Sequence, residues 1–146
     1  MKSLKLKIIL FSMIVLTFWS ITAFAGDEDK INVVIDNQAI VFDVDPIIIE
    51  GRTMVPFRKI FEIFNFKVDW AASTTTVLAN NGSQIIVLQI DNKKAFVNNK
   101  QFDLDVPAQL IDGRTMVPLR FVSEHIGANV EWIGETRTVK ITSKSN

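Results

Sequence analysis

The six residues Gly-Arg-Thr-Met-Val-Pro occupy positions 51–56 and return unchanged at positions 113–118. The offset between the two copies of this hexapeptide is 113 − 51 = 62 positions. An unchanged hexapeptide in a chain of 146 residues indicates an internal repeat. A repeat restricts the folds that the chain can adopt.

Residues on both sides of the hexapeptide follow the same offset. The matched pairs are Ile35 and Val97, Asn37 and Asn99, Asp43 and Asp105, Ile49 and Ile111, Arg58 and Arg120, Glu62 and Glu124, Val68 and Val130, Trp70 and Trp132, and Val77 and Val139. Nearly all of the chain after Ala25 is therefore one unit written twice, in copies spanning about residues 31–90 and 91–142.

The second copy shows a family resemblance most clearly. It reads Gly-Arg-Thr-Met-Val-Pro-Leu-Arg-Phe-Val-Ser-Glu from position 113 and Gly-Ala-Asn-Val-Glu-Trp from position 127. This pattern closely resembles the copper amine oxidase N-terminal (stalk) domain family, over roughly residues 31–142. The resemblance implies a small antiparallel sheet curled around helix, without catalytic machinery, in secreted and surface proteins of Gram-positive bacteria. The oxidase name comes from a domain appended in some enzymes, so it transfers no chemistry.

The segment from Met1 to Ala25 has the pattern of a secretory signal peptide. Three lysines precede an apolar run at residues 8–21, and Ala-Phe-Ala at positions 23–25 is a small-x-small cleavage site. The apolar run is shorter than the ~20 residues of a spanning helix. The sequence therefore predicts cleavage after Ala25, in preference to an uncleaved anchor, and a mature domain of residues 26–146.

Composition excludes several functional classes. Loss of the three signal lysines leaves 16 − 3 = 13 basic residues against 16 acidic ones, a net charge of −3, and no basic patch indicates a nucleic-acid partner. The chain has no Cys, so the fold depends on its hydrophobic core. It also has no Tyr and one His, whereas copper amine oxidase chemistry needs a Tyr-derived cofactor and three His ligands. We expect no cofactor and no enzymatic activity, although a small hydrolase remains a weak third class.

Local patterns predict the elements of each copy. Residues 31–35 and 74–79 are rich in β-branched side chains and predict strands. Residues 47–49 predict a buried extended run, and Asn81-Gly82 predicts a hairpin that leads into residues 84–90. A turn is expected at Glu50-Gly51 in front of the first hexapeptide.

A helix is predicted after each hexapeptide, opened by Pro56 or Pro118. The inner faces are Phe57, Ile60, Phe61 and Phe64 in the first helix, and Leu119, Val122 and Ile126 in the second. Asn65 and Gly127 suit the left-handed conformation that ends a helix. The predicted fold is α+β: an antiparallel sheet curled around two helices, built from two pseudo-symmetric copies of a strand-strand-helix-strand-strand unit that share one core.

The matched polar and aromatic residues are the candidate binding positions, with a mainly structural role expected. They are Gly51, Arg52, Pro56, Arg58, Trp70, Gly113, Arg114, Pro118, Arg120 and Trp132. For the hexapeptide arginines, bonds to loop carbonyls are favoured over anion or glycan contacts at a helix N-terminus. For the tryptophans, core packing is favoured over sugar stacking in solvent. The Arg58–Glu62 and Arg120–Glu124 spacings favour weak surface pairs over pairs that fix the helix against the hexapeptide loop.

A metal site is disfavoured by the ligands available. A lone His cannot build a zinc site, so His125 is expected to be a partly exposed helix residue. The aspartates at positions 43, 45, 103 and 105 could seed a calcium site, but strand-end solvation is favoured.

These observations predict a non-catalytic, secreted binding or scaffolding module at the cell envelope. Its expected partner is a protein or wall polymer at the cell surface, and the alternative is a cell-wall glycan-binding accessory domain. The expected location is extracellular, with wall association possible, and no membrane contact is expected after cleavage.

Overall fold

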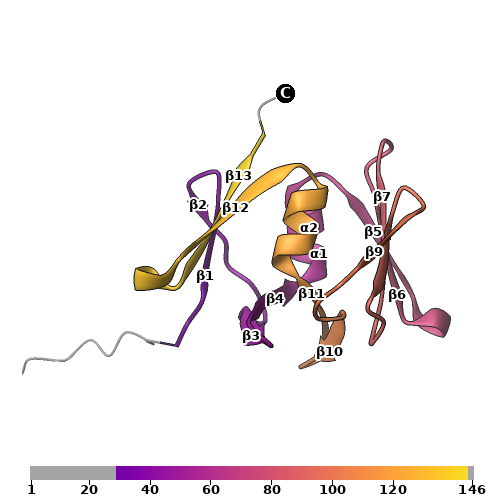
Figure 1. Cartoon of the computed structure of the whole chain (residues 1–146), viewed down its shortest axis with the longest axis horizontal. Coiled ribbons are helices and arrows are strands. Elements are labelled where there is room, and N and C mark those ends of the chain that lie inside the picture. The colour runs from indigo at the N-terminus through magenta and orange to yellow at the C-terminus, as the bar shows by residue number, and fades with distance from the viewer. Residues whose placement is uncertain (1–28, 145–146) are drawn as a thin grey trace, which may run out of the picture.

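The computed structural model describes residues 29–144, where it contains thirteen strands and two α-helices (Figure 1). The predicted signal peptide, residues 1–25, lies outside the described residues. The first part of the chain forms β1 (Asn32–Ile35), β2 (Gln38–Ala39), β3 (Ile47–Ile49), β4 (Arg52–Pro56), α1 (Phe57–Ile63), β5 (Lys67–Ala71), β6 (Thr76–Asn80) and β7 (Ile85–Gln89). The second part forms β8 (Lys94–Val97), β9 (Lys100–Asp103), β10 (Gln109–Ile111), β11 (Arg114–Pro118), α2 (Leu119–His125), β12 (Ala128–Ile133) and β13 (Thr138–Ser143).

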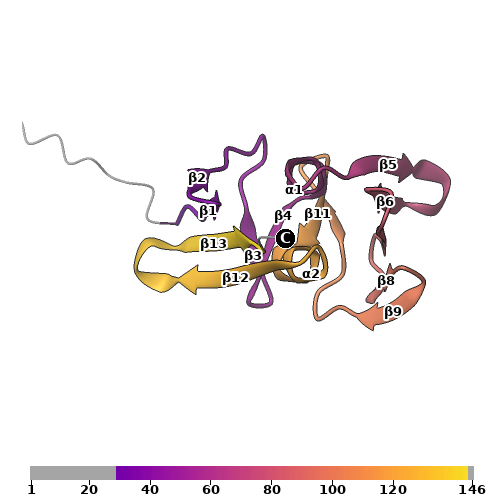
Figure 2. The same ribbon diagram turned by 90° about the horizontal axis from the view of Figure 1, so that it is seen from above.

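The described strands form three sheets. The terminal sheet has the order β12-β13-β1-β2, the motif sheet β10-β11-β4-β3, and the middle sheet β5-β6-β7-β8-β9. Figure 1 shows the two helices between the terminal and middle sheets, with the motif sheet below them. The chain is mostly sheet with two helices, as predicted, and the fully antiparallel middle sheet curves past both helices (Figure 2).

The repeated hexapeptides supply the two central strands of the motif sheet. β4 and β11 pair antiparallel with Val55 opposite Val117, and the central Thr, Met and Val are favourable strand residues. Each strand follows a two-residue hairpin turn, Glu50-Gly51 or Asp112-Gly113, in which both residues have positive φ. This is the geometry of a type I′ turn, which Gly adopts without strain. The turn predicted at Glu50-Gly51 is confirmed.

The prolines end strands and do not open helices, so this part of the prediction was wrong. Pro56 and Pro118 are the last residues of β4 and β11, with extended ψ angles of 120° and 111°. The fixed φ of proline suits an extended residue as well as a helical one, so α1 and α2 begin one residue later. Asn65 and Gly127 have φ of 60° and 87°, which confirms the predicted helix ends.

The helices bury one face between the terminal and middle sheets. One cluster of buried side chains includes residues of both copies, as expected for a shared core. Its helical members are Phe57, Ile60, Phe61, Leu119 and Val122, and its strand members include Val33, Ile35, Val77, Ala79, Ile86, Leu88, Ala95, Val139 and Ile141. The predicted inner-face residues Phe64 and Ile126 are only half-buried, because each lies at its helix C-cap.

A second, smaller core lies at the motif sheet. Met54 and Met116 are fully buried there together with Val106, and Ile47 and Ile49 pack against them. The prediction that residues 47–49 are buried was wrong for Ile48, which is 46% exposed. Successive side chains of a strand point to opposite faces, so only the outer two residues can reach the methionines.

The two copies exchange strands. β1 of the first copy pairs parallel with β13 of the second, and β7 of the first pairs antiparallel with β8 of the second. The parallel pair departs from the predicted antiparallel sheet, and it joins residues as distant as Asn32 and Thr138, 138 − 32 = 106 positions apart. The hairpin predicted at Asn81-Gly82 is confirmed by the pairing of β6 with β7.

Candidate functional site

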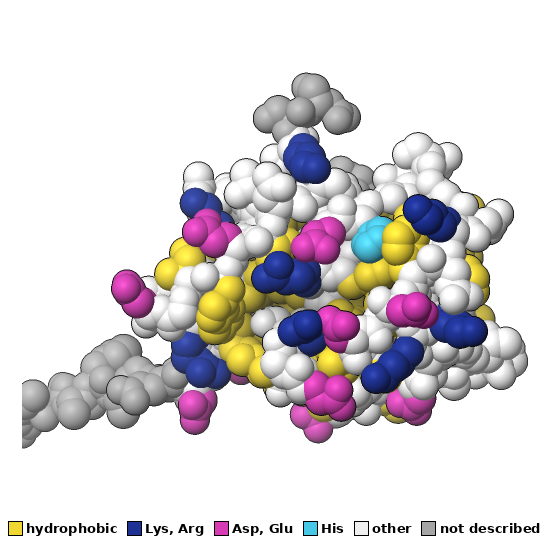
Figure 3. Space-filling view, viewed as in Figure 1, with side chains coloured by type: hydrophobic (Ala, Val, Ile, Leu, Met, Phe, Trp, Pro, Cys, Tyr) yellow, Lys and Arg dark blue, Asp and Glu magenta, His cyan; other side chains and the backbone are white. Residues whose placement is uncertain are grey.

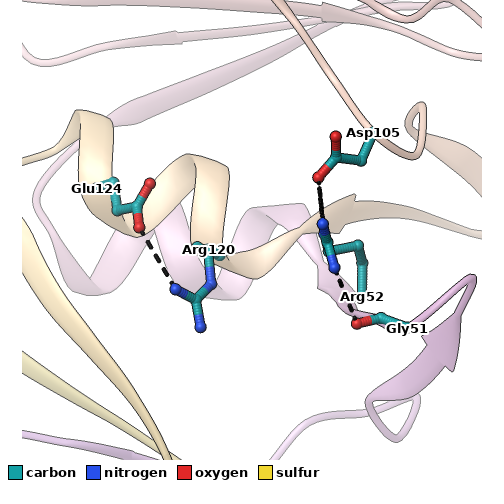
Figure 4. Close-up of polar contacts among 5 residues, drawn as sticks. All are labelled: Gly51, Arg52, Asp105, Arg120 and Glu124. Atoms are coloured by element: carbon teal, nitrogen blue, oxygen red, sulfur yellow. Dashed lines mark hydrogen bonds and ion pairs between the residues drawn. The ribbon is translucent and has the colours of Figure 1, made fainter.

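Each hexapeptide arginine reaches an aspartate that belongs to the other copy. Arg52 donates from Nε and Nη2 to Asp105 Oδ2 at 2.8 and 2.6 Å, and from Nη1 to the Gly51 carbonyl oxygen at 3.5 Å (Figure 4). The predicted carbonyl contact is present, but the shorter bonds go to the carboxylate. The pair therefore ties the first hexapeptide to the loop before β10.

The second arginine makes the matching contacts. Arg114 Nε donates to Asp43 Oδ2 at 2.5 Å, and Nη1 donates to the Gly113 carbonyl oxygen at 3.3 Å. The hydrogen bond from Arg114 holds the pKa of Asp43 below its ordinary value, so this carboxylate stays ionised. Sequence reasoning missed these bonds, although a signal was present: the two aspartates are separated by the repeat offset, and so are the two arginines.

The helix ion pairs have the geometry of weak surface contacts. Arg58 Nη1 lies 3.9 Å from Glu62 Oε1, and Arg120 Nη1 lies 3.8 Å from Glu124 Oε1 (Figure 4). All four side chains are more than half exposed, so solvent screens the attraction. The favoured interpretation, a surface pair, agrees with this geometry.

The tryptophans do not lie in the core, so the favoured interpretation was wrong. Trp70 is 39% exposed and Trp132 is 41% exposed. The physical reason is their position on β5 and β12, the edge strands of the middle and terminal sheets, which have no neighbouring strand on one side.

Trp70 lines the larger of the hollows described here, which we call the Trp70 groove. The groove has a volume of about 690 Å³. Its principal lining side chains are Val41, Arg58, Lys59, Trp70, Leu110 and Arg114. They come from the loop after β2, from α1, from β5 and from the strands β10 and β11. The hollow thus brings together five of the predicted site residues, since Pro56 and Gly113 line it as well, with Val41, Lys59 and Leu110, which sequence reasoning did not single out.

A smaller hollow lies beside α2, and we call it the Phe121 groove. It has a volume of about 230 Å³ and includes Arg52, Phe102, Asp103, Phe121 and His125 in its lining. The ring centroid of His125 lies 4.4 Å from that of Phe102 and 4.2 Å from that of Phe121. The ring centroids of Phe102 and Phe121 are 6.2 Å apart, so the three rings form one aromatic cluster at this position.

His125 is a half-buried helix residue, in agreement with the prediction. Its Nδ1 lies 2.7 Å from the Phe121 carbonyl oxygen, which can only accept, so Nδ1 carries the donated proton. Figure 3 shows this face of the molecule, with the His in cyan beside hydrophobic side chains and with acidic and basic side chains interspersed.

Within residues 29–144, no group of three or more His, Cys, Asp or Glu side chains is arranged to hold a metal ion. The four aspartates considered as calcium ligands are included in this statement, and two of them bond to arginine instead. No helix of the described part of the chain is long and apolar enough to cross a membrane.

The family follows from comparison with known proteins. The sequence profile of the copper amine oxidase N-terminal domain matches residues 34–141, so the chain belongs to this family. The match is to the N-terminal domain alone, which fits a non-catalytic module. A Brevibacillus choshinensis protein named "Protease inhibitor" is 28% identical over 102 residues, covering 70% of this chain and 30% of that protein. The chain thus corresponds to about a third of the length of this curated relative.

Proposed function

We propose that the chain is a non-catalytic binding or scaffolding module at the cell envelope, and that the Trp70 groove is its contact site. The observation that carries the proposal is an open hollow of about 690 Å³ in which Val41, Trp70 and Leu110 remain exposed. Apolar side chains gathered in one concave site are typical of binding surfaces. Membership of a family named for an N-terminal domain supports a role other than catalysis.

A protein is the first candidate partner. The Brevibacillus relative is named a protease inhibitor, and an inhibitor of that kind acts by contacting another protein. Residual activity of secreted bacterial proteases in the presence of the purified chain tests this candidate. Saturable, stoichiometric inhibition would support a protease as the partner, whereas unchanged activity would direct the search to other proteins.

A wall glycan is the second candidate, and the exposed faces of Trp70 and Trp132 favour it. Indole rings at a rim can stack on sugar rings, which offer an apolar face. In a variant with Trp19→Phe and Trp132→Phe, wall polysaccharide should then change the fluorescence of Trp70. Fluorescence that stays constant at saturating polysaccharide would count against this candidate.

The location at the envelope rests on the signal-like pattern of residues 1–25. We propose that export removes this segment after Ala25. N-terminal sequencing of protein recovered from the culture medium should start at Gly26. Intact chain in the cytoplasm, with Met1 retained, would contradict the proposal.

We also propose that the two copies form a pseudo-symmetric pair of strand-strand-helix-strand-strand units. Elements β3, β4 and α1 have the same bounds as β10, β11 and α2 after addition of 62, and the arginine–aspartate bonds are reciprocal. Asp43→Ala and Asp105→Ala should therefore lower the unfolding midpoint in urea to the same extent. Clearly different midpoints for the two variants would argue that the two positions are not equivalent.

Binding to fractionated envelope tests the proposed function itself. Protein and polysaccharide fractions are each passed over the immobilised purified chain, and Trp70→Ala is compared with the matched control Trp132→Ala. Loss of a central Trp costs about 2 kcal/mol or more, so Trp70→Ala should weaken binding by more than roughly tenfold. The proposal would be contradicted if neither fraction bound to the chain, or if Trp70→Ala and Trp132→Ala bound equally well.

A further inference from the structure

The Trp70 groove exposes apolar side chains from three separate segments. Val41 is 83% exposed and Leu110 is 61% exposed, and both lie in the lining together with Trp70. Leaving such side chains in water is unfavourable, and a ligand with apolar groups would remove them from it. The ligand must therefore offer apolar surface to aliphatic as well as aromatic side chains.

The charges of the groove have a positive excess. Arg58, Lys59 and Arg114 line it against the acidic Asp43 and Glu62, which gives 3 − 2 = +1. Both carboxylates already have a cationic neighbour, since Asp43 bonds to Arg114 and Glu62 lies near Arg58. Lys59 takes part in no ion pair among residues 29–144, so its charge is available to a ligand.

The Phe121 groove is lined in part by the counterparts of residues that line the Trp70 groove, but Trp132 and Ile48 are not among them. The repeat offset carries Val41 onto Asp103 and Lys59 onto Phe121. The lining charges there are Arg52 and Arg120 against Asp103, Asp105 and Glu124, which gives 2 − 3 = −1 with neutral His. With Asp103 in place of Val41 and Phe121 in place of Lys59, the Phe121 groove, which is also the smaller of the two, has a lining of opposite net charge.

We propose that the Trp70 groove binds an extended segment of a partner protein that carries apolar side chains and carboxylates. This inference names the partner chemistry of the binding site proposed above and rests on that proposal. Val41, Trp70 and Leu110 take the apolar side chains of the segment, while Lys59 and the flanking guanidinium groups attract its carboxylates.

The aliphatic side chains favour a protein segment over a polysaccharide. A sugar ring can stack on Trp70, but Val41 and Leu110 have no donor or acceptor for its hydroxyl groups. Sugar hydroxyls placed against these two side chains would lose hydrogen bonds to water without replacement. Leu and Ile side chains of a peptide have no such groups to satisfy.

Titration of defined probes into the ¹⁵N-labelled purified protein tests the inference. The probes are a short peptide that alternates Leu and Asp, its charge-reversed counterpart that alternates Leu and Lys, and polygalacturonate as an anionic polysaccharide. The acidic peptide should shift the indole N–H signal of Trp70 and leave that of Trp132 in place. Its affinity should fall as salt is added, because Lys59 and its neighbours contribute through charge.

Variants of exposed residues assign the binding to the groove. Lys59→Glu and Leu110→Ser should each weaken binding of the acidic peptide by roughly tenfold or more, which is the effect typical of a central interface residue. Ile48→Ser, which changes the position matched to Leu110, is the control and should bind like the unaltered protein. Unchanged unfolding midpoints would show that all three variants retain the fold.

Three results would overturn the inference. The first is that the charge-reversed peptide binds as tightly as the acidic peptide, and the second is that polygalacturonate binds while the acidic peptide does not. The third is that neither Lys59→Glu nor Leu110→Ser weakens binding of the acidic peptide. If an envelope fraction binds through Trp70 while the acidic peptide does not bind, the partner chemistry is wrong and the proposed function stands. If neither the envelope fractions nor the probes bind, both proposals fail.

Discussion

The terminal and middle sheets are built from matching hairpins but are closed in different ways. In the middle sheet, each strand from β5 to β9 pairs with its neighbour in the chain. In the terminal sheet, β13 pairs directly and in parallel with β1, the first strand described. The middle sheet has one more strand than the terminal sheet. In the middle sheet β7 lies between β6 and β8, whereas in the terminal sheet β13 and β1 are direct neighbours. The repeat thus specifies the hairpins, and the connection between copies specifies how they join.

This difference has an energetic consequence. The middle sheet forms between segments that are close in the sequence, whereas the terminal sheet closes the whole described chain on itself. Closing a long loop costs more chain entropy than closing a short one. Both sheets nevertheless cover the same pair of helices and share one buried cluster. We therefore expect the sheets to differ in when they form during folding and to be lost together at equilibrium.

The largest effect is expected at the small core that both hexapeptides build. Met54→Asp and Met116→Asp each place a carboxylate at a fully buried position with no charge partner nearby in the methionine cluster. A lone buried charge is costly, so each substitution should lower the free energy of unfolding by more than about 4 kcal/mol. Both sheets should then unfold. Circular dichroism and urea titration check this. The control is Ile48→Asp, at an exposed position of the same sheet, where a native-like midpoint is expected.

Core positions matched between the sheets sharpen the kinetic comparison. Val77 in the middle sheet and Val139 in the terminal sheet are both buried, and Val→Ala at either should cost about 1–3 kcal/mol. Val77→Ala should mainly slow folding, because local strands pair early, whereas Val139→Ala should mainly speed unfolding. Stopped-flow chevrons of the two variants measure the difference. If Val139→Ala instead mainly slowed folding and Val77→Ala mainly sped unfolding, the terminal sheet would form first.

Much of this fold was predictable from local patterns, but the pairing of the sheets was not. The turn at Glu50-Gly51 and the hairpin at Asn81-Gly82 have strong short-range signals, and both predictions are confirmed. The partner of β1 lies near the opposite end of the described chain, and strand periodicity gives no register over that distance. A one-residue error at Pro56 arose because its fixed φ suits both a strand end and a helix start.

The candidate site was predicted in part. The repeat singled out five residues that do line the larger groove: Pro56, Arg58, Trp70, Gly113 and Arg114. Val41 and Lys59 were missed because they differ from their counterparts in the second copy, and a search for matched residues passes over such positions. Trp70 was placed in the core because residue type alone does not reveal an edge strand.

A smaller effect should distinguish the sheets by pH. Asp36 accepts hydrogen bonds from the hydroxyl and backbone N–H of Ser143 on β13, while its counterpart Asn98 accepts one from the Ile85 N–H on β7. The Ser143 hydroxyl and N–H lower the pKa of Asp36 below 3.8. Its contribution is therefore present above pH 3.8 and is lost as the pH falls through the lower value of the folded state.

The comparison of wild-type protein with Asp36→Asn measures this contribution. The stability difference between the two proteins should be constant above pH 3.8 and should shrink below it. Asn98 does not titrate, so Asn98→Ala should differ from wild type by the same amount at every pH. A pH-independent difference for Asp36→Asn would show that this contact does not stabilise the terminal sheet.

The smallest effect is expected at the helix surface pairs. Arg58→Ala and Arg120→Ala remove matched i, i+4 pairs whose closest atoms are 3.9 and 3.8 Å apart. Each should cost no more than about 0.5 kcal/mol, and the cost should decrease in high salt. Thermal unfolding at two salt concentrations measures both. A loss well above this range at either arginine would assign it a structural role beyond the surface pair.

Because strands are exchanged between the copies, we expect one cooperative unit, and the two tryptophans test this expectation most directly. Trp70 reports on the edge of the middle sheet and Trp132 on the edge of the terminal sheet. Two variants, Trp19→Phe with Trp132→Phe and Trp19→Phe with Trp70→Phe, leave one reporter each. In urea, both fluorescence transitions should have the same midpoint and slope, coincident with the loss of circular dichroism. Two separate midpoints, one for each Trp, would contradict the shared core.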